Sequence, residues 1–328
     1  MSGKLAVVFG GSGFLGRNVV RELAKRGWRV RVAVRRPHHA QFLRPMGAVG
    51  QIQLTQANVR YPASVAQAIK GADAVINLVG LLTQSWSQSF EAVQAAGAET
   101  IAKIAKEQDV KSFIQVSAIG ADAKSDSLYA RTKAEAEQAV LSAIPSATIM
   151  RPSLIFGPED DFFNRFAQMA TLSPLLPLIG GGKTKFQPIY VDDVADGICA
   201  ALEKPQSQGR IFELGGPKVY SFKELMDLLL VQTGRKRMLL PLPFWGASII
   251  GRFGEAFRFI PFFDQPITRD QVKLMKADNI VGVSDDENVG TIEDFAIETT
   301  TLEAILPEYM VRYRKYGQFT ETDSPVSA

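Results

Sequence analysis

The sequence has few of the residues from which many enzymes build nucleophilic and metal sites, with one cysteine and two histidines among 328 residues. A single thiol, Cys199, excludes a disulfide framework, and the helical pattern around it predicts a small buried hydrophobe rather than a nucleophile. His38 and His39 are adjacent in a polar stretch, so neither a metal cluster nor a Ser-His-Asp relay can be assembled. Any proton transfer must therefore use tyrosine, lysine, aspartate or glutamate, and we expect no metal.

The chain also lacks a marked excess of either charge and lacks a long apolar run. Its 37 Lys and Arg against 34 Asp and Glu give a net charge of +3, too small to imply a nucleic acid partner without a clustered patch. The longest apolar runs are interrupted by proline and glycine and fall short of the ~20 residues that a membrane span needs. Because the first predicted strand starts at Lys4, we expect no signal or transit peptide and a protein that stays inside the cell.

What the sequence does contain is a regular alternation of strands and helices. The stretch "KLAVVFGGSGFLGRNVVRELAKRGWRVRVAV" reads as strand, glycine turn, amphipathic helix and strand, which is a βαβ unit. The alternation continues to a strand "ATIMRPS", and later a helix from Val191 to Glu203 is followed by the strand "RIFELGG". This pattern predicts an α/β protein with a doubly wound, parallel Rossmann-type sheet and a smaller, mostly helical C-terminal domain.

The looser pattern after Arg151 suggests where the two domains divide. We assign residues 1–151 and 187–216 to the Rossmann domain, and residues 152–186 and 217–328 to the smaller domain. Near its end the smaller domain is expected to carry a basic helix at residues 310–316.

Three glycines, Gly10, Gly13 and Gly16, stand where the first strand turns into the first helix. The first two allow the backbone to approach a diphosphate at the helix N-terminus, and the third allows helix and strand to pack closely. The spacing is GxxGxxG, and its place between a strand and a helix predicts a dinucleotide site.

The residues at the end of the second predicted strand indicate whether the dinucleotide is NAD(H) or NADP(H). The NAD form of this fold places an acidic residue there, whereas this chain has Arg35 and Arg36, whose guanidinium groups suit a 2′-phosphate. NADP(H) is therefore preferred, although two solvated arginines at a strand end would give the same pattern. Asn58 and Val59, after the third strand, are expected to lie near the adenine.

Four motifs in order, "GGSGFLG", "YARTK", "RPSLIFGPED" and "FQPIYVDDVADGI", resemble those of atypical, extended-type short-chain dehydrogenases/reductases. More narrowly, "RPSLIFGPEDDFFNRFA", "QPIYVDDVADGI" and "PITRDQVKLMKADNIV" resemble the NADPH-binding accessory subunits of respiratory complex I, NADH:ubiquinone oxidoreductase. The resemblance covers roughly residues 4–316 and suggests a bacterial relative of the mitochondrial subunit.

The resemblance implies a tightly held, structural NADPH, with Arg35 at its 2′-phosphate and Arg36 beside it. It also implies complex I core subunits as partners and a peripheral position on the cytoplasmic side of the inner membrane. The residues that map onto the family's glycine turn are Gly10, Ser12, Gly13, Phe14, Leu15 and Gly16.

Tyr129 and Lys133 map onto the superfamily's catalytic pair, in which the lysine lowers the tyrosine pKa and binds the nicotinamide ribose. Their i, i+4 spacing places both on one helix face. In "VSAIG", however, Ser117 is followed by Ala118 where the working serine is expected, so Ser117, Ser125 and Ser127 remain candidate substitutes. We favour a structural pair, with Lys133 holding the ribose; a reductase or a nucleotide-sugar epimerase/dehydratase is the alternative, and a non-catalytic sensor of the NADPH/NADP ratio is a third.

Two further stretches have alternative interpretations. Asp160 and Asp161 resemble paired carboxylates, but a solvated helix start explains them better. Residues 235–263 place basic residues before a run of aromatics, which suits a membrane surface, lipid or partner contact, or else a lid over a substrate cleft. The resemblance favours the first of these for residues 235–263.

Overall fold

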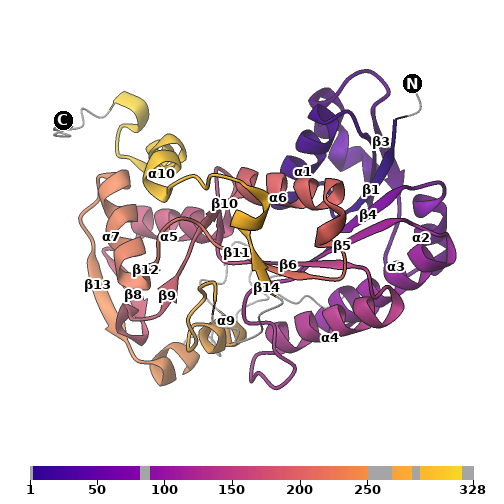
Figure 1. Cartoon of the computed structure of the whole chain (residues 1–328). Coiled ribbons are helices and arrows are strands. Elements are labelled where there is room, and N and C mark those ends of the chain that lie inside the picture. Colours follow the sequence, from indigo (N-terminus) through magenta and orange to yellow (C-terminus); the bar gives the residue numbers. More distant parts are fainter. Residues whose placement is uncertain (1–2, 82–88, 250–267, 283–288, 320–328) are drawn as a thin grey trace.

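The computed structural model describes residues 3–81, 89–249, 268–282 and 289–319. Its main sheet has eight parallel strands in the order β14-β11-β6-β5-β4-β1-β2-β3 (Figure 1). The strands are β1 (Leu5–Phe9), β2 (Arg29–Val34), β3 (Ile52–Gln56), β4 (Ala74–Asn77), β5 (Ser112–Val116), β6 (Thr148–Pro152), β11 (Ile211–Leu214) and β14 (Val289–Thr291). The predicted parallel Rossmann-type sheet is confirmed.

Helices cover both faces of this sheet. One face packs against α1 (Phe14–Lys25) and α6 (Val191–Glu203), and the other against α2 (Pro62–Ile69), α3 (Ala96–Glu107) and α4 (Leu128–Ala143). Successive side chains of β1 point to opposite faces of the sheet. Ala6 and Val8 lie in the core on the α1 and α6 side, and Val7 and Phe9 lie in the core on the side of α2, α3 and α4. The sheet is thus buried on both sides, as its nearly continuous apolar strands predict.

The strand order fixes where a ligand site can form. From β1 the chain moves outward to β2 and β3, then returns to the other side of β1 with β4 and continues to β5 and β6. In open sheets of this kind, ligands bind outside the carboxyl ends of the strands, at the point where the order reverses. The turn after β1 and the segments after β4 and β5 therefore define the candidate site.

A third core lies in the smaller lobe beside the sheet (Figure 1). Its helices are α5 (Asp161–Leu172), α7 (Phe222–Thr233), α9 (Arg269–Leu274) and α10 (Leu302–Met310). Short strands pair within it or link it to the sheet: β7 (Ile155–Phe156) with β10 (Ile189–Tyr190), β8 (Leu175–Ile179) with β13 (Met238–Leu242), and β9 (Lys185–Phe186) with β12 (Tyr220–Ser221). Phenylalanine side chains such as Phe156, Phe163 and Phe222 fill this core.

Two expectations about the C-terminal region need correction. Strand β14, inside the range 217–328 that we assigned to the smaller domain, extends the main sheet by pairing with β11. The expected basic helix at 310–316 is wrong: α10 ends at Met310, and 3₁₀ turns follow at Val311–Tyr313 and Gly317–Phe319. Helix α10 carries the buried apolar side chains, whereas Arg312 and Arg314 after it donate to the carbonyl oxygens of Pro158 and Gln232 at 3.1 and 2.9 Å.

Among the helices that the structure describes, none is long and apolar enough to cross a membrane.

Candidate functional site

The glycine turn joins β1 to α1 with little space between backbone segments. Gly10 has a φ of +79°, and a Cβ there would lie 3.1 Å from the carbonyl of Leu78. A Cβ on Gly16 would lie 2.2 Å from the carbonyl oxygen of Gly10, so no larger residue fits without movement of the backbone. Gly13 is the N-cap of α1 and supplies no side-chain cap. The turn is therefore compact, and the first N–H groups of the helix are available to an anion.

The other turn residues connect this loop to the rest of the fold. Leu15 packs against the core on the α1 side of the sheet. The Phe14 ring approaches Gly157, where a Cβ would lie 3.3 Å from its Cζ atom. Ser12 is half-buried in the turn.

Arg35 and Arg36 directly follow β2, and both are exposed. Within the part of the chain that the structure describes, neither guanidinium makes an ion pair or a side-chain hydrogen bond. Two arginines at the carboxyl end of the strand beside β1 are placed to meet an anionic group near the glycine turn.

Asn58 and Val59 follow β3, one strand farther from the turn. The Asn58 side-chain oxygen accepts from the Arg60 N–H at 3.1 Å, and the Asn58 backbone exchanges hydrogen bonds with the Ser64 hydroxyl. Val59 packs against α3, where a Cβ on Gly97 would lie 2.9 Å from it. Both residues therefore help to shape the β3–α2 loop.

Tyr129 and Lys133 lie in the first turns of α4, at the carboxyl edge of β5. The Lys133 ammonium lies 3.3 Å from the Val116 carbonyl oxygen and 5.7 Å from the centre of the Tyr129 ring. Phe90 packs edge-on against that ring, with the centroids 5.9 Å apart. Tyr129 and Lys133 thus lie on the same face of α4, as their i, i+4 spacing predicts.

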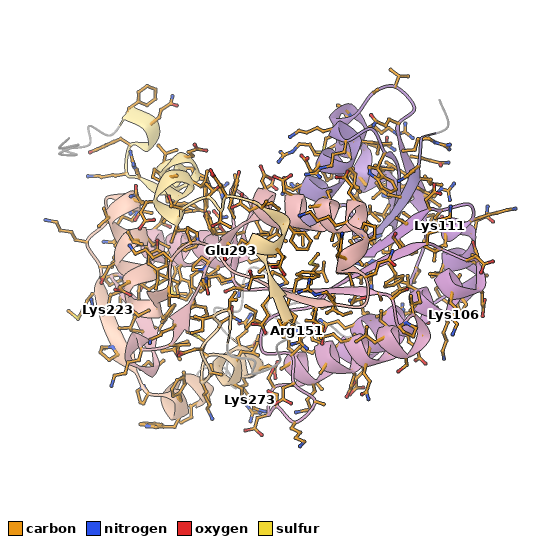
Figure 2. The ribbon with its side chains drawn as sticks, in the orientation of Figure 1. Lys106, Lys111, Arg151, Lys223, Lys273 and Glu293 are labelled. Carbon is orange, nitrogen blue, oxygen red and sulfur yellow. The ribbon has the colours of Figure 1, made fainter. Side chains whose placement is uncertain are left out.

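Burial controls the protonation of both groups. It lowers the pKa of Lys133 from the usual 10.5 to about 8, although the nearby Glu137 carboxylate acts in the opposite direction. Burial also raises the pKa of Tyr129 to about 12, so the phenol holds its proton at neutral pH. Glu137 itself is held by Arg151, labelled in Figure 2, through hydrogen bonds of 2.9 and 2.6 Å.

Ser117, directly after β5, is 4 % exposed. Its hydroxyl oxygen is buried and has no hydrogen-bond partner among the described residues. Leaving a buried hydroxyl without a hydrogen bond is costly, so this group is available to a ligand at the carboxyl end of β5. Ser127, by contrast, is fully engaged at the start of α4, and Ser125 accepts from the Ser127 N–H at 3.2 Å. Of these three serines, Ser117 alone has a hydroxyl without a hydrogen bond in the part of the chain that the structure describes.

The residue that sequence reasoning missed is Asp270, at the start of α9. Its carboxylate accepts from the Ser127 hydroxyl and the Leu128 N–H, both at 2.8 Å, and from the Tyr129 N–H at 3.1 Å. It thereby satisfies N–H groups at the start of α4 that have no partner inside the helix. In the sequence Asp270 stands out only as part of the motif "PITRDQVKLMKADNIV", and that motif does not indicate a contact with α4.

Asn279, from the same motif, fastens the chain to the carboxyl ends of β5 and β6. Its side-chain amide donates to the Ile119 carbonyl at 3.4 Å, and the Ser153 hydroxyl lies 2.7 Å from its side-chain oxygen. Its backbone N–H donates to Lys185 at 2.8 Å and its carbonyl accepts from Gln187 at 3.1 Å.

Asp160 caps α5, as the helix-start interpretation predicts, but it is 2 % exposed and not solvated. The Tyr309 hydroxyl donates to it at 2.7 Å, joining α10 to α5. Burial raises the Asp160 pKa to about 6, against the effect of Tyr309 and of three backbone N–H donors.

Of the segment 235–263, the structure describes residues up to 249. Phe244 packs into the smaller lobe, directly over Gly180. Trp245 and Met238 are 71 % and 65 % exposed, and Leu240 and Ile249 are also exposed. The expected contact of residues 250–263 lies outside the described residues. In the described part of the chain, no group of three His, Cys, Asp or Glu side chains could hold a metal ion.

The chain is similar in sequence and in fold to known proteins. Residues 6–215 match the model of the NAD dependent epimerase/dehydratase family. The chain is 37% identical over 325 residues to "NADH dehydrogenase [ubiquinone] 1 alpha subcomplex subunit 9, mitochondrial" of Arabidopsis thaliana, covering 97% of this chain and 80% of that protein. It is 32% identical over 255 residues to the "Ceramide reductase" of Caulobacter vibrioides, covering 77% of this chain and 78% of that one.

A solved structure has the same fold. The NADPH-dependent quinone oxidoreductase QOR2 from Escherichia coli, complexed with NADPH, superposes with a TM-score of 0.70, at 18% identity, over 93% of this chain and 98% of that chain.

Proposed function

The chain belongs to the NAD dependent epimerase/dehydratase family, and from that premise we propose that it is an NADP(H)-binding accessory subunit of respiratory complex I. In this role the nucleotide acts as a structural ligand and is not turned over. The observation that carries the proposal is the likeness to the Arabidopsis thaliana subunit over 97% of the chain. That likeness extends through the C-terminal third, beyond the residues 6–215 that match the family model.

The described residues fit a dinucleotide. The turn at Gly10 and Gly16 admits no Cβ, the N-terminus of α1 has no side-chain cap, and Lys133 and Ser117 present a cation and an unpartnered hydroxyl after β5. NADPH would supply a hydride donor at its nicotinamide ring. The chain's own groups would bind the diphosphate at the turn and the ribose at Lys133, and a ligand bound only to the folded state stabilises it by mass action.

The preference for NADP(H) over NAD(H) rests on Arg35 and Arg36. Both guanidinium groups are exposed after β2 and have no side-chain partner among the described residues, and no acidic residue follows that strand to accept from a ribose hydroxyl. Asn58 and Val59 would border the adenine from the β3–α2 loop.

A structural role is supported by the state of the Tyr129–Lys133 pair. A catalytic tyrosine needs a pKa brought toward the working pH, whereas burial raises that of Tyr129 to about 12. Ala118 occupies the position expected for the working serine. We therefore assign Lys133 to ribose binding and Tyr129 to packing beside the nicotinamide.

The partners proposed are the core subunits of complex I, at the cytoplasmic side of the inner membrane. Met238, Leu240 and Trp245 are exposed apolar side chains on the surface of the smaller lobe, and Lys236, two residues before Met238, is also exposed. Such a surface suits a membrane interface or a partner subunit.

One observation favours a second function. The unpartnered hydroxyl of Ser117 lies next to Val116, whose carbonyl holds Lys133, and could serve in place of the missing serine. A reductase or a nucleotide-sugar epimerase/dehydratase using Tyr129 and Lys133 is then the alternative, in line with the likeness to a ceramide reductase.

Purification of complex I from detergent extracts, through a tagged core subunit, tests the assembly role. We expect this chain in the purified complex, with NADP(H) released when the chain is denatured. A complex that lacks the chain would end the assembly proposal, and recovery of NAD(H) alone would remove the argument from Arg35. Loss of a carbonyl-reducing activity in Tyr129→Phe would establish the alternative.

A further inference from the structure

Residues 268–282, which we call the strap, cross the carboxyl edge of the sheet (Figure 1). At one end α9 lies beside the start of α4, where Asp270 binds and Lys273 donates to the Asp126 carbonyl at 3.0 Å (Figure 2). At the other end, the N–H groups of Val281 and Gly282 donate to Gln187 and Glu213, both at 3.0 Å. The strap therefore bridges α4, the segments after β5 and β6, and β11.

Asp270 is the strap's charged contact with the helix that carries Tyr129 and Lys133. All three donors to its carboxylate, Ser127, Leu128 and Tyr129, lie at the first turn of α4. Leu128 and Tyr129 lie at the positive end of the 16-residue helix, so the charge interacts favourably with the helix dipole as well as with the N–H groups.

The same helix carries Lys133, which we assign to the nucleotide site. Lys133 reaches the Val116 carbonyl, while Asn279 of the strap holds the Ile119 carbonyl three residues farther on. A shift of α4 along its axis would break the Asp270 bonds and move the Lys133 ammonium at the same time.

From these contacts we propose that the strap acts as a latch. Its docking on α4 through Asp270 raises the affinity of the nucleotide site, and a bound nucleotide in turn stabilises the docked strap. Asp270 is a positioning residue, because it acts through the first turn of α4. The inference rests on the proposed nucleotide site. Both contacts act on α4, so fixing that helix through one of them leaves less conformational entropy to lose when the other forms. By linkage, the factor by which the seated strap raises affinity for the nucleotide equals the factor by which the nucleotide favours the seated strap.

The experiment uses the full-length protein, freed of nucleotide, with NADPH as the probe. Asp270→Asn removes the carboxylate charge and is expected to weaken NADPH binding roughly tenfold, in keeping with the loss of a charged helix cap. The matched control is Asp278→Asn, another strap carboxylate, which accepts from the Lys185 N–H at 2.9 Å and does not touch α4. We expect the control to change affinity less than about threefold. Circular dichroism establishes that both variants fold.

A second measurement needs no mutation. The backbone N–H groups of Asn279, Val281 and Gly282 are hydrogen-bonded at the far end of the strap, so their hydrogen exchange reports its seating. NADPH is expected to slow their exchange several-fold in the unmodified protein and to leave it unchanged in Asp270→Asn. A residue with only a local structural role would not produce that difference.

Three results would overturn the latch: unchanged NADPH affinity in Asp270→Asn, equal losses in both variants, or strap exchange that NADPH does not affect. Failure of the unmodified protein to bind NADPH would instead remove the proposed nucleotide site, and the latch with it.

Discussion

The glycine turn and the first turn of α4 both lie at the carboxyl edge of the sheet, yet they are stabilised by different means. The glycine turn depends on neighbours in the chain: Gly16 packs on Gly10, six residues earlier, and the Gly13 N–H donates to the Gly10 carbonyl at 3.0 Å. The start of α4 depends on Asp270, between 141 and 143 residues away in the sequence. The packing of Gly16 on Gly10 is complete once one βα unit has formed, whereas the start of α4 needs the C-terminal region in place.

This difference explains what each region tolerates. A change in the glycine turn acts on backbone packing and cannot be relieved elsewhere. A change at the start of α4 acts on a contact between two parts of the chain that can separate, so its effect depends on what else holds them together. The following changes test that contrast, from the largest expected effect to the smallest.

Gly16→Val should have the largest effect, because a Cβ at this position would lie 2.2 Å from the Gly10 carbonyl oxygen. We expect a loss of more than about 3 kcal/mol in the free energy of unfolding, measured by urea denaturation, together with loss of nucleotide binding. The control is Gly13→Ala, whose Cβ would lie 3.3 Å from the same oxygen and whose φ of −76° suits any residue. Similar losses for the two variants would contradict the packing argument.

Lys133→Met should stabilise the nucleotide-free protein while weakening NADPH binding. The folded-state pKa of about 8 lies below the usual 10.5, so below pH 8 the folded protein carries the full cost of a buried charge, on the order of 3 kcal/mol. That cost is relieved as the pH rises from about 8 to 10.5, because the folded state has then lost a proton that the unfolded state keeps.

Urea denaturation of both proteins at several pH values tests this. The advantage of Lys133→Met is expected to be present at pH 7 and to disappear near pH 10.5. An advantage that does not vary with pH would mean that packing, and not the charge, is responsible.

Arg35→Asp should weaken binding of NADPH by about 1.5–3 kcal/mol and that of NADH much less, because only the former has a 2′-phosphate. Titration with both cofactors measures the difference. Equal losses would indicate damage to the turn after β2 and not a lost phosphate contact.

Tyr309→Phe tests the smaller lobe. It removes the hydroxyl that donates to Asp160 at 2.7 Å, and we expect a loss of about 1–2 kcal/mol in the free energy of unfolding. NADPH affinity should stay the same, since the contact joins α10 to α5. A large change in affinity would show that the two regions are more strongly coupled than their separate cores imply.

Tyr129→Phe should have the smallest effect. If no reaction uses the phenol proton, NADPH binding and assembly into complex I should both remain unchanged. The Phe90 contact is made by the ring, which phenylalanine keeps. Weakened nucleotide retention, measured after gel filtration, would assign the hydroxyl a binding role.

The sequence predicted the parts of the molecule that local pattern determines. The helix Val191–Glu203 has the predicted bounds, because its apolar positions follow a helical period and acidic residues occupy its first turn. The i, i+4 spacing of Tyr129 and Lys133 likewise predicted that both lie on one helix, and they do lie in α4. Strand β14 was missed because "VGT" is three residues long and shows no period.

The strap could not be predicted from spacing at all. Asp270 and Asn279 act through contacts with residues more than 90 positions earlier in the chain, and nothing in their local sequence distinguishes them from surface polar residues. Only the folded chain brings their partners to one edge of the sheet.

The position of β14 has a consequence for synthesis of the protein on the ribosome. Strand β11 ends at Leu214, but its outer neighbour begins at Val289, so about 75 further residues must be made before that edge is paired, or roughly 4 to 15 seconds of translation. During this interval β11 presents a row of unpaired backbone groups to other nascent chains and to chaperones. A messenger RNA truncated before codon 289 would leave the edge permanently open and yield a product prone to aggregate.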